Sequence, residues 1–241
     1  VAFAEMTGQR KQMEDSILLT HNNDIFGFAV YDGHCGDALS RFASFELYEA
    51  INSSEEISTA FIEKTLQISN EYLRGKHLKS GSTLAISLLQ GNKLICSNVG
   101  DARILIIDNN GNIQFQTVDH KPNERKEFER IKNEGGYIAS NDRINGVLAV
   151  SRALGDFRFK GVSCIPDTTQ MTLTDNLKWL IIGCDGIFEK LSNEEIAKLA
   201  VQTHSADKLS YLLRNTAYGA GSQDNLSVIA INLQQFIHLE K

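Results

Sequence analysis

Short apolar runs that stop at turn-forming residues are the most regular pattern along the chain. Ile25 to Tyr31 (IFGFAVY) leads into Asp32-Gly33, and Trp179 to Gly183 (WLIIG) leads into Cys184-Asp185-Gly186. Both runs are shorter than a typical helix and are followed by glycine, which favours buried β-strands that end in turns. We therefore predict a strand over each run.

Other strands are predicted in pairs around polar turns. Glycine and asparagine supply the backbone conformations that hairpin turns require. Around Gly91 and around Asp108 to Gly111 we expect hairpins, and a last alternating run predicts one more strand. These strands are Thr83 to Leu89, Lys93 to Asn98, Arg103 to Ile107, Ile113 to Val118 and Leu226 to Leu233.

Helical periodicity separates these groups of strands. Apolar residues recur at spacings of three and four in Ala38 to Ile51 and in Ile57 to Leu73. Ser192, followed by Asn193-Glu194-Glu195, is typical of a helix N-terminus and predicts a helix to about Val201, with another over Asp207 to Ala217. Helices between groups of antiparallel strands predict a mixed α+β fold in which helix pairs cover the sheets.

Length and composition are those of a globular protein with a sizeable core. The chain has 241 residues, of which 42% are hydrophobic and 22% charged, and it contains no repeat or low-complexity tract. We therefore predict one domain, residues 1–241, which begins with Val rather than Met and is expected to derive from a longer protein or a processed form. The net charge of -6 gives no support to a nucleic-acid partner.

The cysteines and the apolar stretches bear on the compartment. Cys35, Cys96, Cys164 and Cys184 are scattered and form no C-x-x-C pair, which favours free thiols in a reducing environment. We find no secretory signal and no apolar stretch of about 18 residues, so no membrane insertion is predicted. An intracellular (cytoplasmic or nuclear) monomeric domain is the expectation.

Acidic residues lie at or near the ends of the apolar runs. They are Glu14-Asp15, Asp32, Asp101, Asp185 and Asp224. Asp32 and Asp185 each precede a glycine, so a rigid strand would hold each carboxylate at the rim of a sheet. Carboxylates brought together would repel one another unless cations lay between them, and such oxygen ligands select Mg²⁺ or Mn²⁺. Gly33 has no Cβ, so its carbonyl could approach an ion closely.

Taken singly, each acidic site has a simpler explanation. A strand-end Asp-Gly is most often only a turn, and Glu14-Asp15 could be a solvated surface pair. Only the acidic residues considered together favour a metal site over a set of unrelated turns and surface residues.

Eight sequence blocks occur in a fixed order between Gly8 and Ile231. They are GQRKQMED, VYDGHCG, GSTLA, NVGDAR, VDHKP, LAVSRALGDFRFK, CDGIFEKLSNEE and GSQDNLSVI. Each block alone is moderately specific, but the ordered set resembles the signature of the PP2C (PPM) family of metal-dependent serine/threonine protein phosphatases. The resemblance covers nearly the whole chain.

The resemblance implies an antiparallel β-sandwich flanked by helix pairs on both sides (α/β/β/α) that holds two divalent ions, Mg²⁺ or Mn²⁺. By this resemblance Asp32 would bridge both ions and the Gly33 carbonyl would complete one site. Asp185 and Asp224 would bind the other ion.

Further residues take supporting roles by the same resemblance. Glu14 would support the ion pair through water, with Asp15 beside it. Asp101 would hold a third, weaker ion together with Asp185, and Asn225 would orient the Asp224 loop. Thr83 and Arg143 also match positions near the site in this family.

The implied reaction is hydrolysis of phosphoserine or phosphothreonine in phosphorylated protein substrates, by a water activated between the two ions. Arg10 would clamp the phosphate with its planar, permanently charged guanidinium. His34 would protonate the leaving oxygen, because an imidazole can give up a proton near neutral pH. Outside the motif, Arg10 would be read as a surface ion pair and His34 as structural.

Two departures from the family pattern concern the mouth of the site. Cys35 stands where the family usually has glycine, and a side chain there could tighten the entrance. Between Lys160 and Pro166 only GVSCI intervenes, where family members often carry a longer flap. We therefore expect an open cleft whose substrate choice depends on other domains or partners.

Two alternatives remain. A catalytically silent PP2C-like pseudophosphatase could act as a binding module, but such relatives typically lose metal-binding aspartates, and Asp32, Asp185 and Asp224 are present. A phosphodiesterase or nuclease is the second, and the acidic net charge counts against a nucleic-acid substrate.

Overall fold

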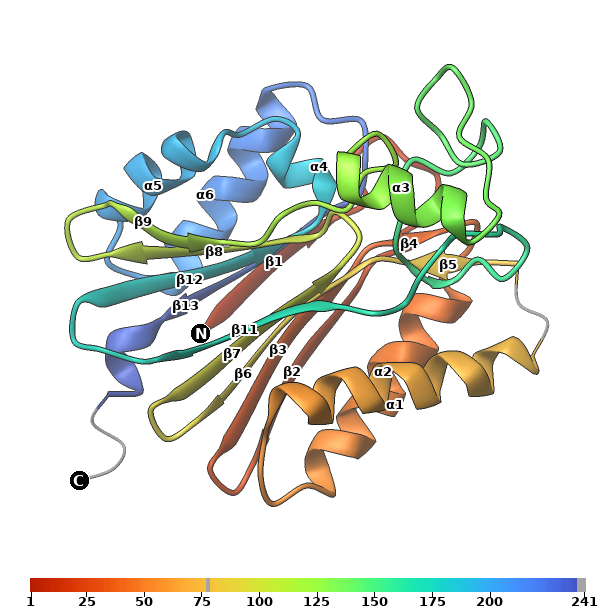
Figure 1. The fold of residues 1–241 in the computed structure, drawn as a ribbon. Helices are drawn as coiled ribbons and strands as arrows, with labels where there is room; N and C mark the ends of the chain where they lie inside the picture. Colours follow the sequence, from red (N-terminus) through yellow and green to blue (C-terminus); the bar gives the residue numbers. More distant parts are fainter. Residues whose placement is uncertain (77–78, 238–241) are drawn as a thin grey trace.

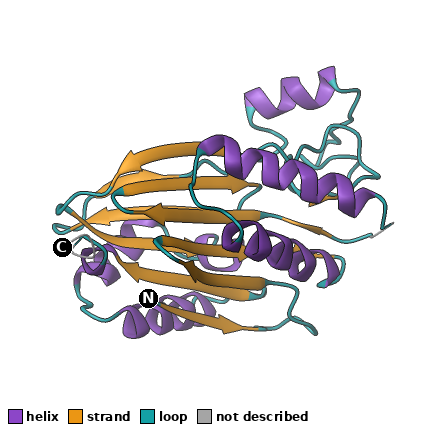
Figure 2. Ribbon diagram, turned by 90° about the horizontal axis from the view of Figure 1, so that it is seen from below, coloured by secondary structure: helices purple, strands orange, loops and turns teal. Residues whose placement is uncertain are grey.

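Two antiparallel sheets pack face to face, with helices on the outer face of each (Figures 1 and 2). The structure is a computed structural model, and it describes residues 1–76 and 79–237. Sandwich and flanking helices together confirm the predicted fold class. Within the described residues, no helix has the length and apolar character needed to cross a membrane.

Each main sheet has five strands. The spatial order in the first is β1 (Ala2–Met6), β13 (Leu226–Asn232), β12 (Leu177–Gly183), β8 (Arg103–Asp108) and β9 (Ile113–Gln116). The order in the second is β11 (Asp167–Thr172), β7 (Lys93–Val99), β6 (Leu84–Gln90), β3 (Ile25–Tyr31) and β2 (Ser16–Asn22). A small third sheet joins β10 (Leu154–Gly155), β5 (Gly81–Ser82) and β4 (Gly33–His34) in that order.

Helices cover both outer faces of the sandwich. Two of them, α1 (Ala38–Asn52) and α2 (Thr59–Arg74), lie on the second sheet, and α5 (Asn193–Val201) and α6 (Ala206–Gly219) lie on the first (Figure 1). The remaining helical elements are α3 (Arg125–Asn133), the short α4 (Asp185–Phe188) and the 3₁₀ turn Leu233–Gln235.

Burial on both faces explains why the central strands are continuously apolar. In β3, Phe28 and Val30 belong to the core between the sheets, while Ala29 and Tyr31 pack with the apolar residues beneath α1 and α2. Successive side chains of a strand point to opposite faces, so both sets must be apolar. The Tyr31 hydroxyl donates a hydrogen bond to the Ala43 carbonyl oxygen over 3.3 Å, which satisfies the one polar group in this run.

The local signals at helix ends are confirmed. Ser192 Oγ accepts a hydrogen bond from the Glu195 backbone N–H (3.2 Å), and Glu195 Oε2 accepts one from the Ser192 N–H (2.8 Å). This reciprocal pair is a capping box. The helix expected from Ile57 begins two residues later, because the Ser58 hydroxyl caps the Phe61 N–H.

Sequence patterns missed the longer elements β1, β2, β11 and α3, and they also missed the short elements β4, β5, β10, α4 and the 3₁₀ turn. They extended the strand Ile113–Val118 beyond its end at Gln116. Helix α3 (RKEFERIKN) lacks a continuous apolar stripe because ion pairs fill part of its inner face. Buried Glu127 contacts Arg130 and Arg152, each at 2.7 Å. Burial would raise the pKa of Glu127, but these two guanidinium groups lower it to about 2.

Candidate active site

The sequence-predicted site residues converge on one cavity of about 670 Å³. Eight of the nine line it: Arg10, Glu14, Asp32, Gly33, His34, Asp101, Asp185 and Asp224. Asp32 follows β3, Asp185 follows β12, and Asp224 precedes β13. Both sheets therefore bring strand ends to the same cavity.

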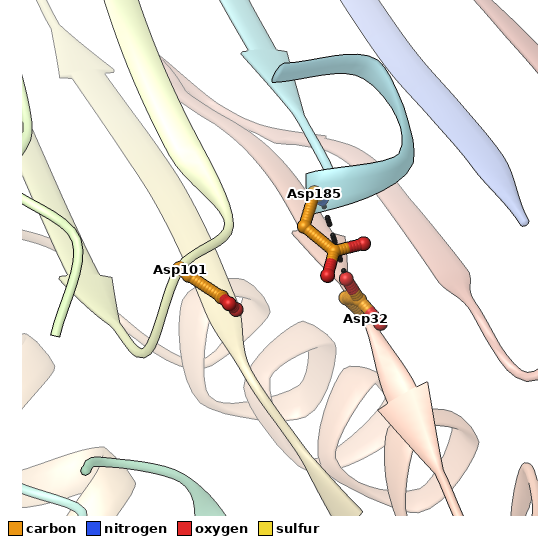
Figure 3. Close-up of side chains that lie close together, drawn as sticks. All are labelled: Asp32, Asp101 and Asp185. Carbon is orange, nitrogen blue, oxygen red and sulfur yellow. Dashed lines mark hydrogen bonds between the residues drawn. The ribbon is translucent and has the colours of Figure 1, made fainter. Parts of the chain in front are cut away.

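Three aspartates form the centre of this cavity. Asp32, Asp101 and Asp185 each offer one carboxylate oxygen, and these oxygens all lie within 4.8 Å of one another. Figure 3 shows the three side chains extending from different parts of the chain toward a common space. The Asp185 backbone N–H donates to Asp32 Oδ2 over 3.4 Å, which ties the α4 turn to the end of β3 (Figure 3).

Two of these three carboxylates, those of Asp32 and Asp185, resist ionisation. Burial raises the pKa of Asp32 well above its ordinary value, and repulsion from Asp185 adds to the shift. Burial also raises the pKa of Asp185 to about 7, with repulsion from Asp101 and Asp224 as further causes. A divalent cation among these oxygens would reverse the balance, because it stabilises the ionised form of each carboxylate.

Close packing of two segments positions Gly33 and Glu14. A Cβ on Gly33 would collide with the Glu14 carbonyl oxygen and would lie 2.9 Å from Ser40 Oγ, so only glycine fits. The Ser40 hydroxyl donates to that carbonyl over 2.6 Å, and Glu14 Oε1 accepts from the Gly36 N–H over 2.8 Å. The Glu14 side chain is thus held at the wall of the cavity.

Asn225 connects the Asp224 loop to the N-terminal segment. Its Oδ1 accepts from the Glu14 N–H (2.8 Å), and its Nδ2 donates to the carbonyl oxygens of Thr7 (2.9 Å) and Gln12 (3.0 Å). These contacts give Asn225 the geometry for the orienting role that the sequence suggested.

Two cationic side chains contact the acidic cluster. Arg10 Nη2 lies 2.5 Å from Asp224 Oδ2, and Lys121 Nζ forms an ion pair with Asp101. Burial lowers the pKa of Lys121, but the Asp101 carboxylate more than offsets this and the net shift is upward. Lys121 was missed in the sequence, although the block DHKP in which it lies could have indicated it.

Asp15 does not line the cavity. Its side chain is buried, and its Oδ2 has no hydrogen-bond partner among the described residues. Burial raises the pKa of Asp15 to about 7, and the nearby Asp224 and Glu5 carboxylates add to the shift. Repulsion from Asp15 is one cause of the raised pKa of Asp32, so Asp15 would influence bound ions through that carboxylate.

The mouth of the cavity contains the expected departure from the family pattern. Cys35 is exposed, lines the cavity and has φ of 59°, a left-handed conformation that favours glycine. Thr83 and Arg143, singled out as neighbours of the site, also line the cavity. A carboxylate that the sequence analysis missed, Asp156, lies 2.6 Å from His34. All four cysteines are free thiols in the described structure.

The donor set fits hard divalent cations. It consists of carboxylate oxygens and a backbone carbonyl, and the described cavity lining contains His34 as its one imidazole. Such ligands suit Mg²⁺ or Mn²⁺ better than Zn²⁺, which prefers nitrogen and sulfur. Asp32, Asp101 and Asp185 are close enough to share one ion.

Comparison with known proteins agrees with this geometry. The sequence profile of the family described as "Protein phosphatase 2C" matches residues 1–226. A curated relative, "Probable protein phosphatase 2C 11" of Arabidopsis thaliana, is 31% identical over 246 residues, which cover 96% of this chain and 66% of that protein. The chain spans between about half and two thirds of the length of the curated relatives that match first.

Solved structures share the fold. A sex-determining protein of C. elegans superposes with a TM-score of 0.86 at 26% identity, over all of this chain and 67% of that one. A phosphatase of Toxoplasma gondii superposes with a TM-score of 0.85 at 24% identity, over 95% and 90% of the two chains. With the profile match over most of its length and the ordered blocks around one acidic cavity, the chain belongs to the protein phosphatase 2C family.

Proposed function

We propose that this chain is a protein serine/threonine phosphatase that hydrolyses phosphoserine and phosphothreonine with the help of two divalent cations, Mg²⁺ or Mn²⁺. One observation carries the proposal. Carboxylates that are far apart in the sequence, such as Asp32 and Asp224, line one cavity. The guanidinium of Arg10 and the imidazole of His34 line it as well.

The residues that would hold the cations are those of the acidic cluster. Asp32 would contact both ions, with the Gly33 carbonyl on one and Asp185 and Asp224 on the other. Glu14 would act through water, and Asp101 would hold a third, weaker ion. When bound, the cations supply charge neutralisation for the phosphoryl oxygens and make water a nucleophile near neutral pH.

The chain's own residues orient the substrate and move a proton. Arg10 would leave Asp224 and bind the phosphoryl oxygens with two parallel N–H groups. The water oxygen forms the new bond to phosphorus while the bond from phosphorus to the serine or threonine oxygen breaks. His34 gives a proton to that leaving oxygen, and the products are inorganic phosphate and the free hydroxyl.

The catalytically silent alternative has little to support it. The relatives named above as phosphatases come from a plant and a parasite, and this chain retains every carboxylate that the proposal requires. Its expected partners are phosphorylated proteins.

The test is phosphate release from a phosphothreonine peptide, with Mn²⁺ and with a chelator. We expect release only with the metal and a loss of at least about a hundredfold in Asp185→Asn, because that change removes a charged ligand. Asp175→Asn, which alters an exposed carboxylate outside the cavity lining, is the matched control and should keep full activity. A folded protein that binds Mn²⁺ but releases no phosphate from any phosphopeptide or aryl phosphate would refute the proposal.

A further inference from the structure

The small third sheet brings His34 next to a carboxylate far away in the sequence. In this sheet Gly81 pairs with His34 on one side and with Gly155 on the other. The residue after Gly155 is Asp156, and its Oδ2 lies 2.6 Å from His34 Nε2. The three two-residue strands thus join two segments that lie 122 positions apart.

Gly81 leaves the space in which these two side chains meet. A Cβ on Gly81 would collide with Asp156 Oδ2 and with His34 Nε2, and it would lie 2.7 Å from Asp156 Cγ. Any larger residue at this position would separate the pair. The middle strand of the small sheet is therefore shaped around the contact.

The backbone around Asp156 is held in an unusual conformation. Gly155 and Asp156 both have positive φ, 83° and 51°. Positive φ is uncommon for a residue other than glycine and persists where the surrounding structure enforces it. Here the Gly155 N–H donates to Asn70 Oδ1 over 2.8 Å, and the Phe159 N–H donates to the Asp156 carbonyl oxygen over 2.9 Å.

Burial makes the pair difficult to explain as a stabilising ion pair. The Asp156 side chain is fully buried, whereas His34 is 27% exposed at the cavity. The second oxygen, Asp156 Oδ1, has no hydrogen-bond partner in the part of the chain that the structure describes. A buried carboxylate with an unsatisfied oxygen reduces the stability of the fold. A contribution to stability therefore does not explain why the chain has an aspartate at this position.

We propose that Asp156 is the positioning residue for leaving-group protonation by His34. Its Oδ2 accepts the hydrogen bond of His34 Nε2–H, fixes the plane of the ring and leaves Nδ1 as the nitrogen that gives its proton to the leaving oxygen. A carboxylate bound to one ring nitrogen determines the role of the other and balances the charge of the doubly protonated ring. This inference rests on the proposed phosphatase function.

The experiment compares substrates with different leaving groups. A serine or threonine alkoxide needs a proton to leave, whereas the weakly basic phenolate of p-nitrophenyl phosphate needs one far less. In Asp156→Asn we expect kcat on a phosphothreonine peptide to fall at least about tenfold, while kcat on p-nitrophenyl phosphate stays within about threefold. KM for both substrates and the affinity for Mn²⁺ should not change.

A double-mutant cycle separates positioning from general structural support. In the His34→Gln background, Asp156→Asn should have no further effect on the phosphothreonine peptide, because the residue through which it acts is gone. Histidine side-chain ¹⁵N NMR gives an independent readout, in which the Nε2 signal of His34 should shift in Asp156→Asn. Asp108→Asn is the matched control, since Asp108 is also buried but lies outside the cavity lining. It should leave the ratio of the two kcat values unchanged.

A second variant, Gly81→Ala, keeps the proposal testable if Asp156→Asn does not fold. Gly81→Ala pushes on the pair without altering either member, and it should reproduce the selective loss on the phosphothreonine peptide. Equal losses on both substrates, or the same loss from Asp156→Asn with and without His34, would overturn the positioning role while leaving the phosphatase intact. A wild-type protein inactive on both substrates would instead overturn the phosphatase proposal, and the role of Asp156 with it.

Discussion

Divalent cations should displace protons when they bind to the acidic cluster. Burial and mutual repulsion raise the pKa of Asp185 to about 7 and that of Asp32 well above its ordinary value. In the metal-free protein both carboxyls therefore retain protons at a pH where an ordinary aspartate is fully ionised. A bound cation needs the ionised forms, so protons and cations compete for the same oxygens.

The magnitude follows from these shifts. At pH 7, Asp185 is about half protonated, because its pKa is about 7. The raised pKa of Asp32 acts in the same direction, so Mn²⁺ binding should release at least about half a proton. Because both pKa values are raised, the affinity for Mn²⁺ should increase with pH, by at least about threefold between pH 6 and pH 7.

Isothermal titration calorimetry measures this release directly. Mn²⁺ is titrated into chelator-treated protein in two buffers that differ in ionisation enthalpy and do not bind the metal, and the difference in heat gives the number of protons released. Asp185→Asn should release about half a proton fewer, and Asp175→Asn, at an exposed carboxylate, should match the wild type. Equal heats in both buffers at pH 7 would refute the reasoning, because the carboxyls would then already be ionised without the metal.

Two further predictions concern single residues of the site. Burial raises the pKa of Asp15 from 3.8 to about 7, so the unfolded chain loses this proton first and stability falls as pH rises through that interval. We therefore expect the Asp15→Asn variant, in the presence of a chelator, to have a larger free energy of unfolding than the wild type. The difference, measured by urea unfolding, should be roughly 1–4 kcal/mol at pH 8 and close to zero at pH 4. An equal gain at both pH values would contradict this origin. Arg10→Lys loses the planar fork that binds phosphate, so its kcat/KM for a phosphopeptide should fall roughly ten- to a hundredfold, mainly through KM in steady-state assays. An unchanged KM would remove Arg10 from phosphate binding.

Local patterns predicted the elements whose signals lie within a few residues. The apolar run Ile25–Tyr31 is a strand with the predicted bounds, because both of its faces are buried. Ser192 begins a helix because its hydroxyl caps a backbone N–H three residues along the chain. Helix α3 was missed because its buried face includes a charged residue, Glu127, where an apolar residue would be expected. Two arginines, Arg130 and Arg152, neutralise this carboxylate.

In the candidate active site, too, some residues are revealed by local sequence and others only by tertiary contacts. Asp32 and Asp185 could be selected as candidates because each ends an apolar run and precedes a glycine. Lys121 and Asp156 lie within the ordered blocks, but neither ends a long apolar run before a glycine. Each acquires its importance from a contact with a residue distant in the sequence, Asp101 for Lys121 and His34 for Asp156.

The sequence by itself determined the apolar central strands, the capped helix and the ordered blocks that identify the family, because these depend on short-range spacing and on residue type. Only the tertiary structure decided which carboxylates share a cavity, that Asp15 is buried outside its lining, and that Gly81 lies between His34 and Asp156. The physical reason is that such contacts depend on strand order and register. Hydrophobic periodicity specifies which face of a strand is buried, but it does not specify the neighbour against which the strand pairs.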